Sequence, residues 1–88
     1  MNVLFVASTA SALGDATRVA VYSLCDGKLS VQDIAQSVNV TSSTASYHIS
    51  VLERAGLVEV RREGRCHRPR RAARGVRVLL MELSRDPG

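Results

Sequence analysis

The 88 residues of the chain make one small domain, close to the size at which a single hydrophobic core is only marginally sufficient. Aromatic residues make up 3% of the sequence, which argues against a protein that stacks single-stranded bases on aromatic side chains. The net charge of +4 is uneven, since residues 61–77 hold eight arginines and one glutamate. Such a basic patch predicts a polyanionic partner; a merely solvated run of charge is the alternative.

The first 13 residues are apolar but lack the basic start of a signal peptide, and they fall well short of the roughly 20 apolar residues of a membrane span. Their apolar residues recur at helical spacing. We therefore expect a helix over residues 2–13, buried against a partner chain, in a cytoplasmic protein with no membrane partner.

A second helix is expected over residues 16–25. Asp15 is a good N-cap, and Asp26-Gly27 has the composition of a turn that ends the helix. Its inward face is expected to hold Val19, Tyr22 and Cys25, with Val21 and Leu24 on the flanks.

A third helix is predicted over residues 30–38. Ser30 and Asp33 have the spacing of a capping box, and Asn39 tolerates the left-handed conformation of a sharp turn. One buried face follows the 3.6-residue period and holds Val31, Ile34, Ala35 and Val38.

A fourth helix is predicted over residues 42–55, with Thr41 as N-cap and Gly56 at its end. Ala45, Ile49 and Leu52 form a narrow apolar seam. The opposite side carries short hydroxyl side chains, which allow close approach to DNA and can donate to phosphates and base edges. This composition is typical of a recognition helix in the major groove; a Ser-rich helix that only tolerates exposure is the alternative. The predicted DNA contacts here are Thr41, Ser42, Ser43, Ser46, Tyr47, Ser50 and Arg54.

A basic β-hairpin is expected over about residues 57–69. The alternation from Leu57 to Val60 predicts a strand, residues 61–65 a turn, and residues 66–68 a return strand that Pro69 cuts short at a sheet edge. A basic hairpin directly behind a recognition helix is a wing. Its predicted contacts with flanking phosphates or a minor groove are Arg61, Arg62, Arg65 and Arg68.

A last helix is predicted over residues 71–83, with a broad apolar face that a second subunit would bury. The whole chain is therefore expected to be a single domain over 1–88, mainly α with a small β-hairpin (α+β), a winged helix-turn-helix that dimerises through its first and last helices. The predicted dimerisation residues are Val3, Val6, Ala10, Val76, Leu79, Leu80 and Leu83.

Four segments follow one another in a familiar order: LGDATR at 13–18, LSVQDIA at 29–35, STASYHI at 43–49 with Leu52 and AGLV at 55–58, and REGR at 62–65. Over about residues 12–68 the chain resembles the ArsR/SmtB family of bacterial winged-helix repressors. The resemblance implies a homodimer that binds an imperfect palindrome in double-stranded DNA and represses a nearby operon. It also implies that Ser43, Ser46 and Tyr47 lie where family members touch bases and phosphates.

The chain departs from the metal-sensing members of that family. Their Cys-x-Cys motif is replaced by Ser30 and Gln32, which cannot hold a soft metal. A second family site on the last helix uses Asp, His and Glu, but residues 71–83 contain no His and only Glu82 as a carboxylate. We therefore expect no metal cofactor.

The remaining cysteines and histidines leave an alternative open. Cys25 is expected in the core and His48 on the side of its helix that faces the core, while adjacent Cys66 and His67 point to opposite faces of a strand and chelate poorly. The arginines around an exposed Cys66 could make it responsive to oxidants. An unconventional metal or redox sensor using Cys25 or Cys66 is thus one alternative, and a protein-interaction module is another.

An enzyme is not expected, because the sequence has no Gly-rich phosphate loop, no Ser/His/Asp set that its helices would bring together and no paired carboxylates in a plausible cleft.

Overall fold

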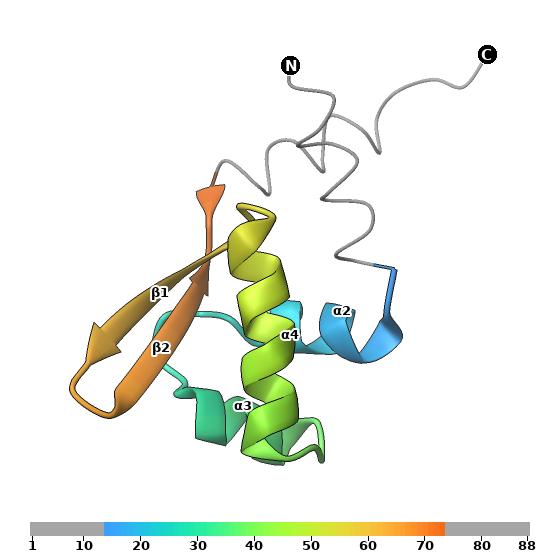
Figure 1. Ribbon diagram of the computed structural model, residues 1–88, viewed down its shortest axis with the longest axis horizontal. Coiled ribbons are helices and arrows are strands. Elements are labelled where there is room, and N and C mark those ends of the chain that lie inside the picture. Colours follow the sequence, from blue (N-terminus) through green and yellow to red (C-terminus); the bar gives the residue numbers. More distant parts are fainter. Residues whose placement is uncertain (1–13, 74–88) are drawn as a thin grey trace.

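The computed structural model describes residues 14–73. Its elements follow in the order α2 (Ala16–Ser23), α3 (Val31–Ser37), α4 (Ser42–Arg54), β1 (Val58–Glu63) and β2 (Cys66–Arg71). Helix α4 runs through the centre, with α2 on one side, the hairpin on the other and α3 crossing near its first turn (Figure 1). The predicted fold class, a mainly α domain with a small β-hairpin, is confirmed. The helix predicted over 2–13 and the dimerisation residues on both terminal helices lie outside the described residues.

Each described helix begins at the N-cap that the sequence predicts. Oδ1 of Asp15 accepts a backbone hydrogen bond of 2.9 Å from the first turn of α2. Ser30 and Asp33 form the capping box, each side chain accepting from the other residue's backbone N–H at 3.1 Å. Oγ1 of Thr41 accepts from the backbone N–H of Thr44 at 3.1 Å. A Thr cap of this kind stabilises its helix by roughly 1 kcal/mol.

The turns that end α3 and α4 also follow the prediction. Asn39 lies between the two helices with φ +59°, the left-handed region that Asn tolerates better than most residues. Gly56 directly follows the C-cap of α4 with φ +79°. The sharp turn at Asn39 fixes the angle at which α4 leaves α3.

The core lies where α4 meets the other elements. The predicted seam of α4 is buried, and His48 joins it with 7% of its surface exposed. A fully buried leucine such as Leu52 contributes about 1.5–3 kcal/mol of hydrophobic free energy relative to an exposed one. The core cluster consists of Val21, Cys25, Ile34, Ile49, Leu52, Ala55, Leu57 and Val58.

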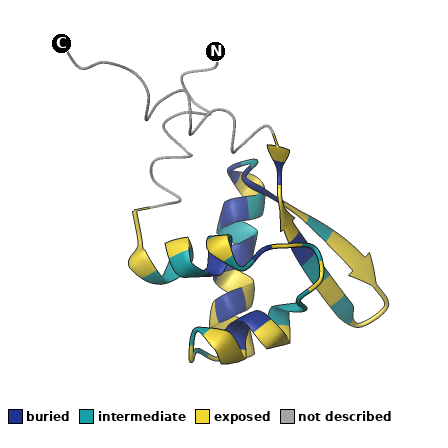
Figure 2. Cartoon of the chain, turned by 180° about the vertical axis from the view of Figure 1, so that it is seen from behind, coloured by how far each residue is buried: buried dark blue, intermediate teal, exposed yellow. Residues whose placement is uncertain are grey.

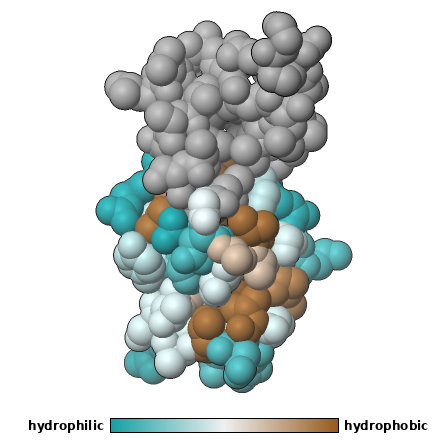
Figure 3. Space-filling model, turned by 90° about the vertical axis from the view of Figure 1, so that its right-hand side faces the viewer, coloured by the Kyte–Doolittle hydropathy of each residue, from teal (hydrophilic) through white to brown (hydrophobic). Residues whose placement is uncertain are grey.

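The inward face of α2 differs from the prediction. Val21 and Cys25 are fully buried, Tyr22 packs against the core only in part, and Val19 is 44% exposed. The helix ends at Ser23 and not at residue 25, and Cys25 donates its S–H to the carbonyl of Val21. Residues 21 and 25, four apart, therefore share the inward face and turn Val19 outward. Apolar surface remains exposed on the side where α2 lies (Figure 3).

The prediction that Pro69 ends the return strand at an edge is wrong. Pro69 is buried and pairs with Val60 inside the hairpin. On the other side of β2, its carbonyl accepts from the N–H of Gly27 and the N–H of Arg71 donates to the carbonyl of Cys25, both at 2.9 Å. The N–H and C=O of one strand residue point to the same side. The missing donor of Pro69 therefore faces the 25–27 loop, and the ladder with β1 is uninterrupted.

The hairpin also extends beyond the prediction, because β1 continues through Glu63 into the expected turn and β2 continues past Pro69 to Arg71. Only Gly64 and Arg65 separate the strands, since Glu63 pairs with Cys66, and Gly64 takes the positive φ of +60° that the tight turn requires. The last helix was expected to begin at Arg71, but Arg71 belongs to β2 and pairs with Val58. Residues 74–83 of that predicted helix lie beyond the described residues.

Candidate nucleic-acid interface

The polar face of α4 is exposed along its length. Ser42, Ser43, Ser46 and Arg54 are exposed, and Tyr47, at 57%, is one of two large hydrophobic side chains exposed between residues 14 and 73. Buried and exposed residues alternate on α4, as on an amphipathic helix that keeps one face exposed (Figure 2). An exposed tyrosine side chain is long enough to contact a ligand and ends in a hydroxyl that can form a hydrogen bond.

Three of the predicted contacts on this helix have local hydrogen bonds, and one of them is Arg54, whose Nε donates to the carbonyl of Ser50 at 3.4 Å. The hydroxyl of Thr41 caps α4 and also donates to Oγ1 of Thr44 at 3.0 Å. The hydroxyl of Ser50 donates to the carbonyl of Tyr47 at 2.8 Å, and Ser50 is only half-exposed. Ser42, Ser43 and Ser46 make no hydrogen bond from their side chains within residues 14–73, so their hydroxyls are available to a ligand.

A residue that the sequence analysis did not select lies behind Tyr47. Arg18 on α2 donates from Nε to Nδ1 of His48 at 3.2 Å, and its guanidinium carbon lies 5.8 Å from the centre of the Tyr47 ring. The rings of Tyr47 and His48 are 5.7 Å apart. No periodicity connects residues 18 and 48, so the contact could not be predicted from the helix pattern. In the sequence, only the place of Arg18 in the LGDATR segment indicated a role for it. Its side chain ties α2 to both the buried and the exposed side of α4.

Most wing arginines are neutralised within the hairpin or against α4. Four of the six arginines between 61 and 71 form an ion pair with a carboxylate. For three of these arginines the carboxylate also belongs to the wing, and for Arg62 it belongs to α4. The pairs are Arg61–Glu63 at 2.6 Å, Arg62–Glu53 at 3.1 Å, Arg68–Glu63 at 3.8 Å and Arg70–Glu59 at 2.6 Å. Much of the positive charge of the wing is therefore locally compensated.

Arg62 crosses from β1 to α4. Both of its terminal nitrogens donate to the carboxylate of Glu53, at 3.1 and 3.2 Å. These hydrogen bonds, together with the charge of Glu53, raise the pKa of the Arg62 guanidinium above its ordinary value. The pair links the wing to the C-terminal half of the helix that it would accompany onto DNA.

Three other arginines hold the wing against the end of α2 and the loop that follows it through hydrogen bonds to backbone carbonyls. Arg61 donates to the carbonyl of Gly27 at 3.4 Å, and Arg68 donates to the carbonyl of Lys28. Arg71 donates to the carbonyl of Ser23 at 2.7 Å at the C-terminal end of α2. These side chains position the hairpin, so part of the basic patch serves the fold.

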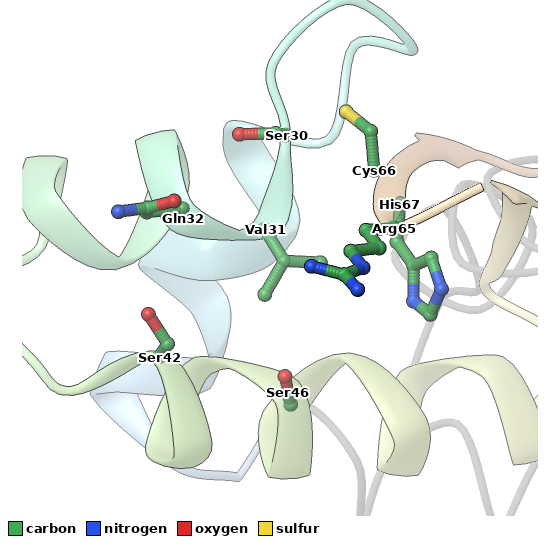
Figure 4. A pocket seen from close by; sticks show the side chains of 8 residues that line it. All are labelled: Ser30, Val31, Gln32, Ser42, Ser46, Arg65, Cys66 and His67. Atoms are coloured by element: carbon green, nitrogen blue, oxygen red, sulfur yellow. The ribbon is translucent and has the colours of Figure 1, made fainter. Parts of the chain in front are cut away.

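Arg65 stands apart from these arginines. It is exposed in the two-residue turn and makes no hydrogen bond or ion pair within the described part of the chain. With residues of α3 and α4 it lines a pocket of about 410 Å³. Its guanidinium reaches into the space between the two helices, and Ser42 and Ser46 point into the same space from α4 (Figure 4).

The resemblance places two polar residues of this chain at the family's metal-sensing positions. Ser30 and Gln32 supply a hydroxyl and an amide, which are poor ligands for soft metals. Across residues 14–73 no group of three His, Cys, Asp or Glu side chains is placed to hold an ion. Cys25 has the predicted place in the core, because its side chain is fully buried, and this burial raises the pKa of its thiol to about 11. Every helix in the same range is too short or too polar to cross a bilayer.

A helix-turn-helix with an exposed polar second helix, followed by a basic hairpin, defines a winged-helix domain. Residues 13–61 match the model of a helix-turn-helix domain family. The chain is also 32% identical to the homodimeric winged helix-turn-helix DNA-binding domain of a possible ArsR-family regulator from Mycobacterium bovis, with a TM-score of 0.76 over 90% of this chain and 76% of that one. The chain therefore belongs to the helix-turn-helix family, and within it to the ArsR/SmtB type.

Two curated relatives agree with this assignment. The chain is 38% identical over 66 residues to a homolog of the cadmium resistance transcriptional regulatory protein CadC from Staphylococcus aureus, covering 73% of this chain and 54% of that protein. It is 43% identical over 53 residues to the transcriptional regulator KmtR from Mycobacterium tuberculosis, covering 59% and 41%. The chain thus spans about half the length of these relatives.

Proposed function

We propose that this chain is a DNA-binding transcriptional regulator that acts in the cytoplasm. As a homodimer it binds an imperfect palindrome in DNA and represses transcription. The observation that carries the proposal is the exposed polar face of α4, including Tyr47, beside the wing. In this arrangement α4 enters the major groove, and the wing lies over the flanking backbone. The homodimeric relative from Mycobacterium bovis supports the same assembly for this chain.

The cadmium resistance named for the Staphylococcus aureus relative is not part of this proposal. Ser30 and Gln32 replace the thiolates that a soft metal requires, so we propose a regulator without a metal effector at that position.

The test is fluorescence-anisotropy titration of the protein with DNA from upstream of its own gene and with a shuffled duplex, over a series of salt concentrations. Selective binding with a steep salt slope is the expected result. Tyr47→Ala should weaken specific binding by about 1–3 kcal/mol and reduce the preference for the upstream duplex, and Ser46→Ala should also weaken binding. Ser23→Ala, an exposed serine on α2, is the matched control and should bind like the wild type.

Equal weak binding of both duplexes by the wild type would contradict the proposal and favour a protein partner. Sedimentation equilibrium on the same sample tests the homodimer, and a monomer at micromolar concentration would contradict that part of the proposal.

A further inference from the structure

The pocket beside Arg65 has the chemistry of an anion site. Arg65 supplies a guanidinium, whose planar set of N–H donors matches the oxygens of a phosphate. Ser42 and Ser46 line the same pocket with hydroxyls that have no partner within residues 14–73. None of the residues that line it is an Asp or a Glu. The pocket therefore offers donors and positive charge without a competing carboxylate.

Arg65 differs from the other arginines of the wing in its contacts. Arg61, Arg62, Arg68 and Arg70 each pair with a glutamate, and Arg71 donates to backbone carbonyls. Among the wing arginines in residues 61–71, only Arg65 makes neither an ion pair nor a hydrogen bond within the described part of the chain. An incoming anion therefore meets a free guanidinium at Arg65, whereas at the other wing arginines it must displace a carboxylate or, at Arg71, a backbone carbonyl.

We propose that the pocket between α3, α4 and the wing turn binds a phosphate-type oxyanion through Arg65, Ser42 and Ser46. Figure 4 shows the three side chains reaching the same space from two separate elements, the hairpin turn and the first turns of α4. The ligand is either a backbone phosphate of the DNA bound by α4 or a free phosphate-class anion. The pocket of about 410 Å³ is larger than a single phosphate group and opens beside exposed residues of α4, which favours a segment of sugar–phosphate backbone.

The proposal changes the expected role of the wing turn. Arg65 reaches inward to the helices, and it holds one phosphate next to the start of α4. It thereby fixes the register of that helix in the groove, because phosphate contacts set orientation and carry no sequence information themselves. The DNA arm of this inference rests on the proposed function, whereas the free-anion arm does not.

The experiment compares Arg65→Gln with Arg70→Gln in the full chain. Each variant removes one positive charge from the hairpin, but Arg70 is paired with Glu59 at 2.6 Å and lies outside the pocket. In the first arm, inorganic phosphate is titrated at constant ionic strength while backbone amide shifts of residues 42, 46 and 65 are followed by NMR. A free-anion site gives saturable shifts in the wild type and in Arg70→Gln, and none in Arg65→Gln.

In the second arm, duplexes carrying one neutral methylphosphonate at a time are titrated with the three proteins. If a DNA phosphate occupies the pocket, one linkage in each half-site will be sensitive to neutralisation. Neutralising it weakens wild-type binding about 3- to 10-fold and lowers the salt slope of that binding by about 0.9. The same change leaves the affinity of Arg65→Gln unchanged. If Arg65→Gln behaves like Arg70→Gln in both arms, the inference is overturned. If the wild type does not bind the upstream duplex selectively, the proposed function fails, and the first arm alone decides the inference.

Discussion

Nε of Arg18 on α2 donates a hydrogen bond of 3.2 Å to Nδ1 of His48 on α4. A guanidinium has only donors, so Nδ1 of His48 acts as the acceptor in this hydrogen bond. The same guanidinium lies 5.8 Å from the centre of the Tyr47 ring, on the exposed face of the helix. Arg18 therefore couples the packing of α2 to the orientation of a predicted DNA contact.

Arg18→Met should weaken specific DNA binding without unfolding the protein. The substitution keeps the apolar stem but removes the donor to His48 and the cation beside Tyr47. The loss of one partly buried hydrogen bond costs about 1 kcal/mol of stability, measurable by urea unfolding. A double-mutant cycle with Tyr47→Ala separates the roles: a positioning role predicts that the two binding losses are less than additive. Fully additive losses would show that Arg18 does not act through Tyr47.

Arg62 is expected to act through Glu53 and not through a direct DNA contact. Its two hydrogen bonds to that carboxylate join β1 to α4, so the loss of either partner should release the wing to the same extent. We expect Arg62→Gln and Glu53→Gln both to weaken DNA binding, with the double variant no worse than Arg62→Gln. A direct phosphate contact predicts instead that Glu53→Gln, which removes a negative charge, strengthens binding. Anisotropy titrations at two salt concentrations decide between these outcomes.

The two cysteines should differ in reactivity in the native protein. Cys25 is fully buried, with its thiol pKa raised to about 11 because burial penalises the thiolate. Cys66 is half-exposed at the pocket mouth. Iodoacetamide at pH 8 should label Cys66 within minutes and leave Cys25 unlabelled until the chain is denatured, as read by mass spectrometry of the peptides. Labelling of Cys25 at an equal rate in the native state would contradict its place in the core.

The Asp26 side chain should make the loop after α2 sensitive to acid. Backbone N–H groups of Leu29 and Lys28 donate to its carboxylate and hold its pKa below the ordinary value of 3.8. A carboxyl with a lowered folded-state pKa stabilises the fold fully above its unfolded-state pKa, and this stability is lost as the pH falls through the lower, folded-state value. Asp26→Asn, which keeps an acceptor but does not titrate, should flatten the fall in urea midpoint below about pH 4. An unchanged acid profile would exclude this contribution.

The local chemistry of the helices could be predicted from the sequence because short-range hydrogen bonds decide it. Asp15, the Ser30–Asp33 capping box and Thr41 all cap the helices they were expected to cap. Asn39 takes the left-handed conformation in the turn where it was expected. The inward position of His48 also followed from the 3.6-residue period, since the seam of α4 fixed which side of the helix is buried.

Errors arose where distant segments meet. Local rules place Pro69 at a strand edge, yet the loop after α2 pairs with β2 on the side where proline lacks a donor, and the strand continues to Arg71. The face of α2 was misassigned for a similar reason: Val21, and not Val19, is buried with Cys25, and the packing of α2 against α4 decides which side of the helix is buried.

The sequence by itself determined a basic, winged helix-turn-helix chain, because periodicity and capping act over a few residues. It could not show which arginines form ion pairs and which do not, because an ion pair such as Arg62–Glu53 depends on where β1 lies against α4. Nor could it bring Arg65 together with Ser42 and Ser46, since these side chains come from separate elements. Only the packing of the hairpin against the two helices decided which positive charge is left for a ligand.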